Sequence, residues 1–182
     1  MKSIIKNLFF LIIVYSLSSC KSYKNLQTAL LNPENVEVLR LSNGQFVTLP
    51  ASIGKFKNLK KLYLFKNKLS TLPPEIGQLK NLTRLVVSSN NIESLPVEIG
   101  NLENLEFFSL SHNKLKKLPP EIEKLKKLKI LKLDYNELDS LPKEIGSLNR
   151  LEQIFLENNQ LKKHSQRNWK LTISKMASHW EK

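Results

Sequence analysis

The side chains best suited to nucleophilic, redox or metal chemistry in this 182-residue chain are one cysteine and three histidines. Because Cys20 is the only thiol, the rest of the chain cannot form an intramolecular disulfide, a thiolate-ligated zinc cluster or a cysteine-nucleophile enzyme. The histidines lack the spacing of metal ligands, at His112, His164 and His179. Neither a G-x-S-x-G motif nor a glycine-rich phosphate loop occurs. These patterns predict a non-enzymatic protein that uses no cofactor and no metal.

The cysteine ends a segment that is typical of an export signal. The opening MKSIIKNLFFLIIVYSLSSC has a basic start, an apolar run over Ile4–Tyr15 that only Lys6 and Asn7 interrupt, and then small residues. A short membrane anchor is the alternative, but the uninterrupted apolar run over Leu8–Val14 is far below the roughly 20 residues that cross a bilayer. We therefore expect residues 1–19 to be a signal peptide.

The last four residues of this segment, Leu17-Ser18-Ser19-Cys20, place small residues directly before the cysteine. They resemble the lipobox of bacterial lipoproteins, which implies that Cys20 carries a diacylglycerol and becomes the mature N-terminus. Because lipid chains contribute about 0.8 kcal/mol per buried methylene, such an anchor would hold the protein on a membrane of the cell envelope, with the outer membrane or cell surface expected. An ordinary signal peptide with an incidental cysteine is the alternative.

The middle of the chain repeats with a period of 23 residues. The unit LKKLYLFKNKLSTLPPEIGQLKN spans Leu59–Asn81, restarts at Leu82, Leu105 and Leu128, and has fainter copies that open at Val36 and Leu151. Asparagines recur at Asn67, Asn90, Asn113, Asn136 and Asn159, and prolines recur at Pro50, Pro73, Pro96, Pro119 and Pro142. Such a strict period predicts a repeat architecture over residues 36–163.

The unit L-x-x-L-x-L-x-x-N-x-L-x-x-L-P-x-E-I-G-x-L-x-N resembles the leucine-rich repeat, and in particular the 23-residue repeats of spirochaete lipoproteins. The resemblance implies an α/β solenoid: an arc with a parallel β-sheet on its concave face and short helical or 3₁₀ segments on its convex face. It also implies protein–protein interaction, including recognition of host-surface molecules. We expect a monomer. Departures from the pattern occur at Gly44, Phe56, Phe108 and Glu123.

The pattern within one repeat predicts the same structure from physical grounds. Leu62 and Leu64 alternate as in a strand with one buried face, so Tyr63 and Phe65 should face outward. The following segment, punctuated by Pro73 and glycine, should form a tight 3₁₀-like turn. Because one repeat cannot bury its apolar face alone, about six repeats should stack into one parallel sheet.

Residues 20–35 should form a lipidated N-terminus followed by a helix that covers the first repeat. We expect Ser22 as its N-cap and Pro33 as its end. One helical face carries the apolar residues, at Tyr23, Leu26, Ala29 and Leu30. A partner-binding helix is the alternative.

The recurring asparagines fall where each strand ends and the backbone must turn with polar groups facing inward. An amide side chain carries both donors and an acceptor, so a column of amides can satisfy those groups. We therefore interpret Asn67, Asn90, Asn113, Asn136 and Asn159 as a structural ladder rather than as ligand-binding residues.

The outward strand positions are free of packing constraints, yet they carry basic and aromatic residues, which are enriched in interface hot spots. We expect the rings of Tyr63, Phe65 and Phe107 to be largely exposed. The candidate ligand-binding residues are Arg40, Lys61, Tyr63, Phe65, Lys66, Arg84, Phe107, His112, Lys132, Tyr135 and Phe155. A solvated face without a specific site is the alternative.

The formal net charge of +13 remains strongly positive when residues 1–19 are removed, so anionic surfaces are possible partners. The lysines of one repeat, between Lys114 and Lys132, predict either a solvated flank or contact with anionic lipid or glycan. Nucleic acid is not expected, because the opening segment predicts export and the chain has no recognised nucleic-acid module. Two further alternatives are an envelope structural protein and a truncated relic without a ligand.

Residues 164–182, HSQRNWKLTISKMASHWEK, break the period. Large apolar side chains follow helical spacing at Trp169, Ile173, Met176 and Trp180, which allows an amphipathic capping helix. Back-translated with A/T-rich codons and shifted by one nucleotide, however, the segment can be read as IPKEIGNLQFLKWLHIGKN, which continues the repeat in register. We favour a frameshifted repeat of a longer solenoid and expect partial disorder and weak hydrogen-exchange protection after Lys163.

Overall fold

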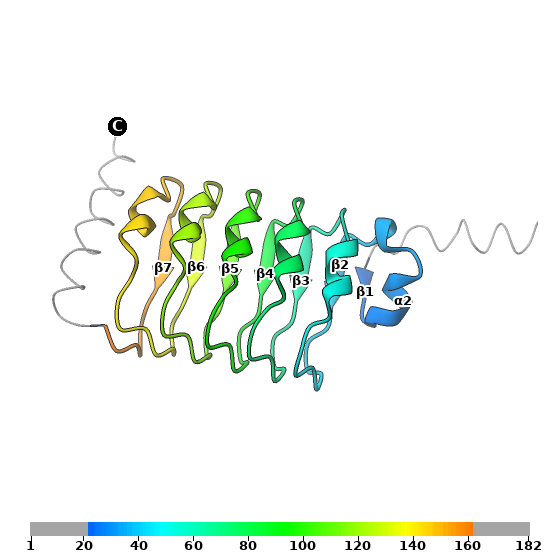
Figure 1. Ribbon diagram of the computed structural model, residues 1–182, viewed down its shortest axis with the longest axis horizontal. Coiled ribbons are helices and arrows are strands. Elements are labelled where there is room, and N and C mark those ends of the chain that lie inside the picture. The colour runs from blue at the N-terminus through cyan, green and yellow to red at the C-terminus, as the bar shows by residue number, and fades with distance from the viewer. Residues whose placement is uncertain (1–21, 162–182) are drawn as a thin grey trace, which may run out of the picture.

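The structure is a computed structural model that describes residues 22–161, and it confirms the predicted solenoid. Its strands form one parallel sheet in which sequence order is also spatial order (Figure 1). Their bounds are β1 Ser22–Tyr23, β2 Val38–Arg40, β3 Lys61–Tyr63, β4 Arg84–Val86, β5 Phe107–Ser109, β6 Ile130–Lys132 and β7 Gln153–Phe155. The register advances by one repeat per strand from β2 onward, so that Lys61 pairs with Arg84 and Arg84 with Phe107.

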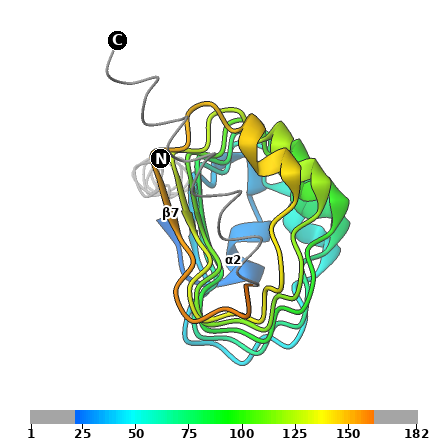
Figure 2. The same cartoon turned by 90° about the vertical axis from the view of Figure 1, so that its left-hand side faces the viewer.

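The opposite side of each repeat is a short 3₁₀ helix that begins directly after a proline. These helices are η3 Ala51–Lys55, η4 Pro74–Gln78, η5 Val97–Asn101, η6 Pro120–Lys124 and η7 Lys143–Ser147. The N-cap prolines have φ between −71° and −63°, which is the value that the pyrrolidine ring fixes. Figure 2 shows these helices stacked on one side of the coil and the strands on the other. The sheet therefore lies opposite a convex layer of 3₁₀ helices, as predicted.

The core lies between the sheet and the 3₁₀ layer. Leu62 and Leu64 are completely buried, as their alternation with outward residues predicted. Phe56 and Phe108, which replace leucines of the repeat, are also completely buried. Both departures therefore keep the inward position apolar, and burial of each such side chain stabilises the fold by about 1.5–3 kcal/mol.

The N-terminal segment differs from the prediction in two ways. Ser22 does not cap a helix: Ser22 and Tyr23 form β1, which pairs in parallel with β2. The helix α2 spans Leu26–Leu30, and its N-cap is Asn25, whose Oδ1 accepts from the N–H groups of Gln27 and Thr28 at 2.8 and 3.1 Å. The edge of β2 has backbone N–H and C=O groups that need hydrogen-bond partners, and residues 22–23 supply them as a strand. The helix therefore has its N-cap three residues later than predicted, at Asn25.

The expected covering role of this segment agrees with its burial. Leu26 and Ala29 on α2 are buried in the core cluster, while Tyr23 packs against that cluster from β1 instead of from a helix. Pro33 begins a second helix, η2 Pro33–Asn35, rather than only ending the first. The segment thus closes the first repeat with a strand, an α-helix and a 3₁₀ turn.

Three predictions lie outside the described residues. They concern the signal peptide in residues 1–19, lipidation of Cys20, and the frameshifted or helical nature of residues 164–182. Within residues 22–161, no helix is long and apolar enough to span a membrane.

Candidate functional site

Each strand from β2 to β7 is followed by one residue in the left-handed backbone region. These residues have φ between 54° and 58° and recur every 23 positions, at Asn43, Lys66, Ser89, His112, Tyr135 and Asn158. A left-handed residue reverses the chain direction sharply, at a modest steric cost for side chains other than glycine or asparagine. The turn orients the residue that follows toward the interior, and in the second to sixth of these turns that residue is a ladder asparagine.

The ladder asparagines connect consecutive repeats through their side-chain amides. Asn90 is typical, since its Nδ2 donates to the carbonyl oxygens of Leu64 and Val87, both at 2.9 Å. Its Oδ1 accepts from the N–H of Leu69 at 3.1 Å. The same three bonds recur at Asn67, Asn113, Asn136 and Asn159. These amides are occupied by the backbone, so they are placed to hold the turns rather than a ligand.

A second asparagine series, which the sequence reasoning did not single out, runs along the opposite ends of the strands. The Nδ2 atoms of Asn58, Asn81 and Asn104 donate to backbone carbonyls of the preceding repeat at 2.8–2.9 Å. The sequence feature that could have revealed this series is the asparagine that ends the 23-residue unit. The next position is Lys127, whose Nζ donates to Oδ1 of Asn104 at 2.7 Å.

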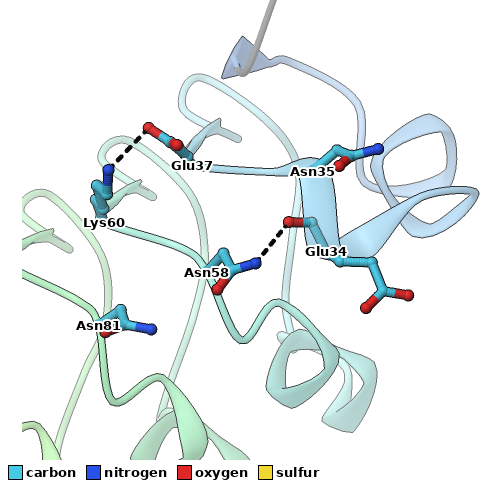
Figure 3. Close-up of a pocket in the computed structure, with 6 residues that line it drawn as sticks. All are labelled: Glu34, Asn35, Glu37, Asn58, Lys60 and Asn81. Carbon is cyan, nitrogen blue, oxygen red and sulfur yellow. Dashed lines mark hydrogen bonds and ion pairs between the residues drawn. The ribbon is translucent and has the colours of Figure 1, made fainter. Parts of the chain in front are cut away.

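Part of this second series lines a polar pocket of about 390 Å³ near the start of the solenoid (Figure 3). Asn58 and Asn81 contribute to it together with Glu34, and Lys60 forms an ion pair with Glu37 at 3.1 Å. Because Asn58 donates to the backbone of Glu34 and Lys60 is held by Glu37, most of the polar groups in this pocket already have partners.

On the sheet face opposite the core, basic side chains lie over aromatic rings, and both kinds of residue are among the candidate ligand-binding residues. Three such pairs join adjacent strands, with the cation always one repeat before the ring. The distances from the cation to the ring centroid are 5.4 Å for Arg40–Tyr63, 4.0 Å for Arg84–Phe107 and 4.8 Å for Lys132–Phe155. Such contacts contribute about 0.5–1 kcal/mol at exposed sites and more when a partner excludes water. Six of the candidate residues are thereby brought together in pairs.

The remaining candidates lie on the same face or at its turn edge. His112 and Tyr135 stack in neighbouring turns, with ring centroids 4.2 Å apart and an interplanar angle of 10°. Lys61 on β3 and Lys66 in the following turn are exposed. Phe65 lies two residues after the end of β3 and is half-buried.

The exposure of the rings departs from the expectation. Tyr63, Phe65 and Phe107 are half-buried rather than largely exposed, because side chains of adjacent strands lie about 4.8 Å away and cover their flanks. Phe155 is 38% exposed because it lies on β7, the last strand of the described sheet, and Tyr135 is 48% exposed in its turn.

A cavity of about 540 Å³ opens at the N-terminal end of this face. The residues that line it are Lys24, Arg40, Ser42, Asn43, Tyr63 and Phe65. Three of them were predicted as binding residues from the sequence, whereas Lys24, Ser42 and Asn43 were not. We call this space the N-terminal cavity. No group of three or more metal-ligating side chains occurs within residues 22–161.

Comparisons with known proteins agree on the architecture. A family model described as a leucine-rich repeat region matches residues 5–107 and 87–171. A leucine-rich-repeat protein from Leptospira interrogans is 36% identical, with a TM-score of 0.70 over 78% of this chain and 48% of that one. The ectodomain of the plant receptor kinase GASSHO1/SCHENGEN3 from Arabidopsis thaliana, solved in complex with CASPARIAN STRIP INTEGRITY FACTOR 2, is also 36% identical, with a TM-score of 0.66 over 76% of this chain and 17% of that one.

A third structure supports the fold alone. An internalin from Listeria monocytogenes is 21% identical, with a TM-score of 0.64 over 76% of this chain and 40% of that one. No curated protein matches the chain. The chain covers less than half the length of each of these three solved structures.

Proposed function

The chain belongs to the leucine-rich-repeat family, and from that premise we propose that it binds a protein ligand through the concave face of its sheet. Leucine-rich-repeat folds commonly mediate protein–protein interactions, and proteins of the family are generally binding scaffolds rather than enzymes. Solenoid curvature creates an extended concave surface to which several repeats contribute. We further propose that a lipid on Cys20 holds this surface outside the cytoplasm at the cell envelope, with host-surface molecules among the candidate ligands.

The observation that carries the proposal is the row of cation–ring pairs on that face. Aromatic residues and arginine are enriched in binding hot spots because they supply large contact areas with polar ends. The three pairs hold their rings in place before a ligand arrives, which lowers the entropy lost on binding. The N-terminal cavity adds a concave region in the size range of ligand sites, roughly 300–1,000 Å³.

The relatives support the same class of function. The plant ectodomain, similar over 76% of this chain, was solved in complex with CASPARIAN STRIP INTEGRITY FACTOR 2. Because this chain corresponds to 17% of that ectodomain, the likeness supports the class of ligand and not its identity.

The test is a selection of binders from a random peptide-display library on the purified protein. We expect the selected peptides to lose affinity about tenfold or more in the double variant Tyr63→Ala/Phe65→Ala, since hot-spot truncations cost about 2 kcal/mol or more. Val97→Ala is the matched control, because Val97 is an exposed apolar residue of η5 on the convex side. Circular dichroism should show the fold unchanged in both variants.

The alternatives give different results. An envelope structural protein or a relic without a ligand should yield no selected binders. A protein that binds through its convex side should yield peptides that tolerate the double variant but not Val97→Ala. A charge-driven glycan or lipid binder should bind anionic vesicles with an affinity that collapses with added salt and tolerates Tyr63→Ala/Phe65→Ala.

A further inference from the structure

One hydroxyl in the N-terminal cavity has no partner inside the protein. Oγ of Ser42 is buried and makes no hydrogen bond within the described residues. The serines at the equivalent position of later repeats are satisfied: Ser88 bonds to Ser109 at 2.6 Å, and Ser111 donates to Asp134 at 2.7 Å. The neighbour of Ser42 in the next repeat is Phe65, which offers no polar atom. An unpaired buried hydroxyl is unfavourable. Because less than 1 Å² of this oxygen is accessible, the Ser42 side chain must rotate toward the cavity before a ligand atom can accept from it.

The same cavity carries two cations and no carboxylate among its lining residues. Lys24 is exposed, and Arg40 uses one of its five N–H donors on the hydroxyl of Ser22. The guanidinium of Arg40 is also positioned over the ring of Tyr63 at 5.4 Å. This contact orients the fork of donors that matches a carboxylate. The cavity therefore favours a negatively charged group with several acceptor oxygens.

Apolar surface adjoins these charges. The half-buried rings of Tyr63 and Phe65 line the same cavity. A ligand group seated between them and the cations would be partly desolvated, which strengthens charge-assisted hydrogen bonds. The cavity volume of about 540 Å³ also exceeds what a lone ion requires.

The charge of the concave face is polarised along the solenoid. The positions compared are the outward residues of each strand and the residue two positions after its end. For β2 to β5 these positions carry no acid and three cations, Arg40, Lys61 and Arg84. The same positions of β6 and β7 carry one cation, Lys132, and two acids, Asp134 and Glu157. An acidic ligand segment is thus attracted to the N-terminal half and repelled from the other end, which would fix its position along the face.

We infer that the N-terminal cavity is the subsite for a side-chain carboxylate of an acidic peptide segment, with a neighbouring aromatic or aliphatic residue of that segment on Tyr63 and Phe65. This inference rests on the proposed function and names the chemistry of the ligand at that face. A carboxylate flanked by apolar groups satisfies the cations, the Ser42 hydroxyl and the rings together. A bilayer headgroup brings the charge but not the flanking apolar residue at this depth.

The experiment uses fluorescein-labelled heptapeptides and measures anisotropy on the full chain. The probe has the sequence Gly-Ser-Phe-Asp-Phe-Ser-Gly, and its matched partner replaces the aspartate with asparagine. We expect the acidic probe to bind about tenfold more tightly, since charged hydrogen bonds contribute about 1.5–3 kcal/mol. Lys24→Gln should remove most of that preference while leaving the asparagine probe unaffected. Arg40→Gln should also remove it, and it should weaken both probes, because Arg40 holds the ring of Tyr63.

Two further variants separate the cavity from general charge. Lys55→Gln removes the same charge from an exposed lysine of η3 on the convex side, and it should change the affinity less than twofold, as is usual for screened surface charges. Ser42→Ala should weaken the acidic probe several-fold without lowering protein stability, because it removes no internal hydrogen bond. Equal loss in Lys55→Gln and Lys24→Gln would overturn the inference.

Other ligand sources give distinct outcomes. Tighter binding of a phosphoserine version of the probe would assign the cavity to phosphate. Competition by phosphatidylglycerol vesicles, if Lys24→Gln abolishes it, would assign the cavity to lipid. Either result would overturn the assignment to a side-chain carboxylate. If no acidic probe binds while library-selected peptides still depend on Tyr63 and Phe65, the concave-face function stands and the carboxylate subsite does not. If the library also yields nothing, the proposed function itself has failed.

Discussion

At the scale of single residues, the turns depend on amides that donate two hydrogen bonds and accept one at the same time. Asn90 bridges two repeats by donating to Leu64 and Val87 and accepting from Leu69. Neither aspartate nor serine provides two donors and an acceptor in this geometry. The ladder therefore limits this position to one residue type, while the preceding left-handed position accepts asparagine, lysine, serine, histidine and tyrosine.

Truncation of one ladder amide should destabilise the protein measurably. We expect Asn90→Ala to lower the free energy of unfolding by about 1–3 kcal/mol, because it leaves buried backbone groups unpaired. Asn91→Ala is the control, since Asn91 is the next residue, is only half-buried and makes no side-chain hydrogen bond within residues 22–161. Urea denaturation followed by circular dichroism gives both values. Equal midpoints for the two variants would contradict the structural role of the ladder.

Residue identity also explains what the sequence could and could not predict about the site. Strand alternation places rings and cations on the outward face of the sheet, so the position of these candidates was predictable from the sequence; their role in binding stays a prediction. Their pairing, such as Arg84 with Phe107, was not, because it depends on rotamers across two strands. The unsatisfied hydroxyl of Ser42 was equally hidden, since burial and missing partners are properties of the folded chain and not of the residue type.

At the scale of elements, the convex 3₁₀ helices pack more closely than side chains would allow. A Cβ added at Gly77 would lie 2.6 Å from the carbonyl oxygen of Glu98, and one at Gly100 would lie 2.5 Å from that of Glu121. These contacts are with the backbone of the next helix in the stack. The glycine of the EIG motif therefore permits close helix stacking rather than an unusual backbone angle.

A methyl group at this position should separate neighbouring helices. We expect Gly100→Ala to destabilise the protein by about 1–3 kcal/mol, the usual penalty for overpacking against a backbone that cannot yield. Gly146→Ala is the matched control, because Gly146 occupies the same position of η7 and is exposed. Thermal unfolding monitored by circular dichroism compares them. A control as unstable as Gly100→Ala would exclude stacking as the cause.

The elements were predictable to different degrees. The 23-residue period, the leucine alternation and the prolines predicted the strands and the 3₁₀ turns. β1 was missed because Ser22 and Tyr23 are too few for any alternation to appear. The predicted start of the helix was wrong for the same reason. Serine is a favourable N-cap, but Ser22 is part of a strand that pairs with the edge of β2.

At the scale of the whole molecule, the lipid proposed at Cys20 lies two residues before β1. Such an anchor would hold the N-terminal end of the solenoid near the membrane. The lipid anchor and the export signal remain predictions from the sequence.

Substitution of the single thiol tests this attachment. We expect Cys20→Ser to move the protein from the detergent phase to the aqueous phase of a Triton X-114 extraction, because one side chain carries the proposed acyl groups. Incorporation of labelled palmitate should disappear in the same variant. Thr48→Ser, at an exposed position outside residues 17–20, is the control. Unchanged partitioning of Cys20→Ser would show that another feature holds the protein on membranes.

The three cation–ring pairs set a step length for whatever lies on them. They begin at β2, β4 and β6, so successive pairs are two strand spacings apart, about 9.6 Å. An extended chain that runs along the solenoid advances about 3.3 Å per residue, so three of its residues cover nearly the same length. An extended ligand with a contacting side chain at every third residue could therefore contact all three pairs. A ligand whose contacting side chains occur at every second residue would not match this spacing.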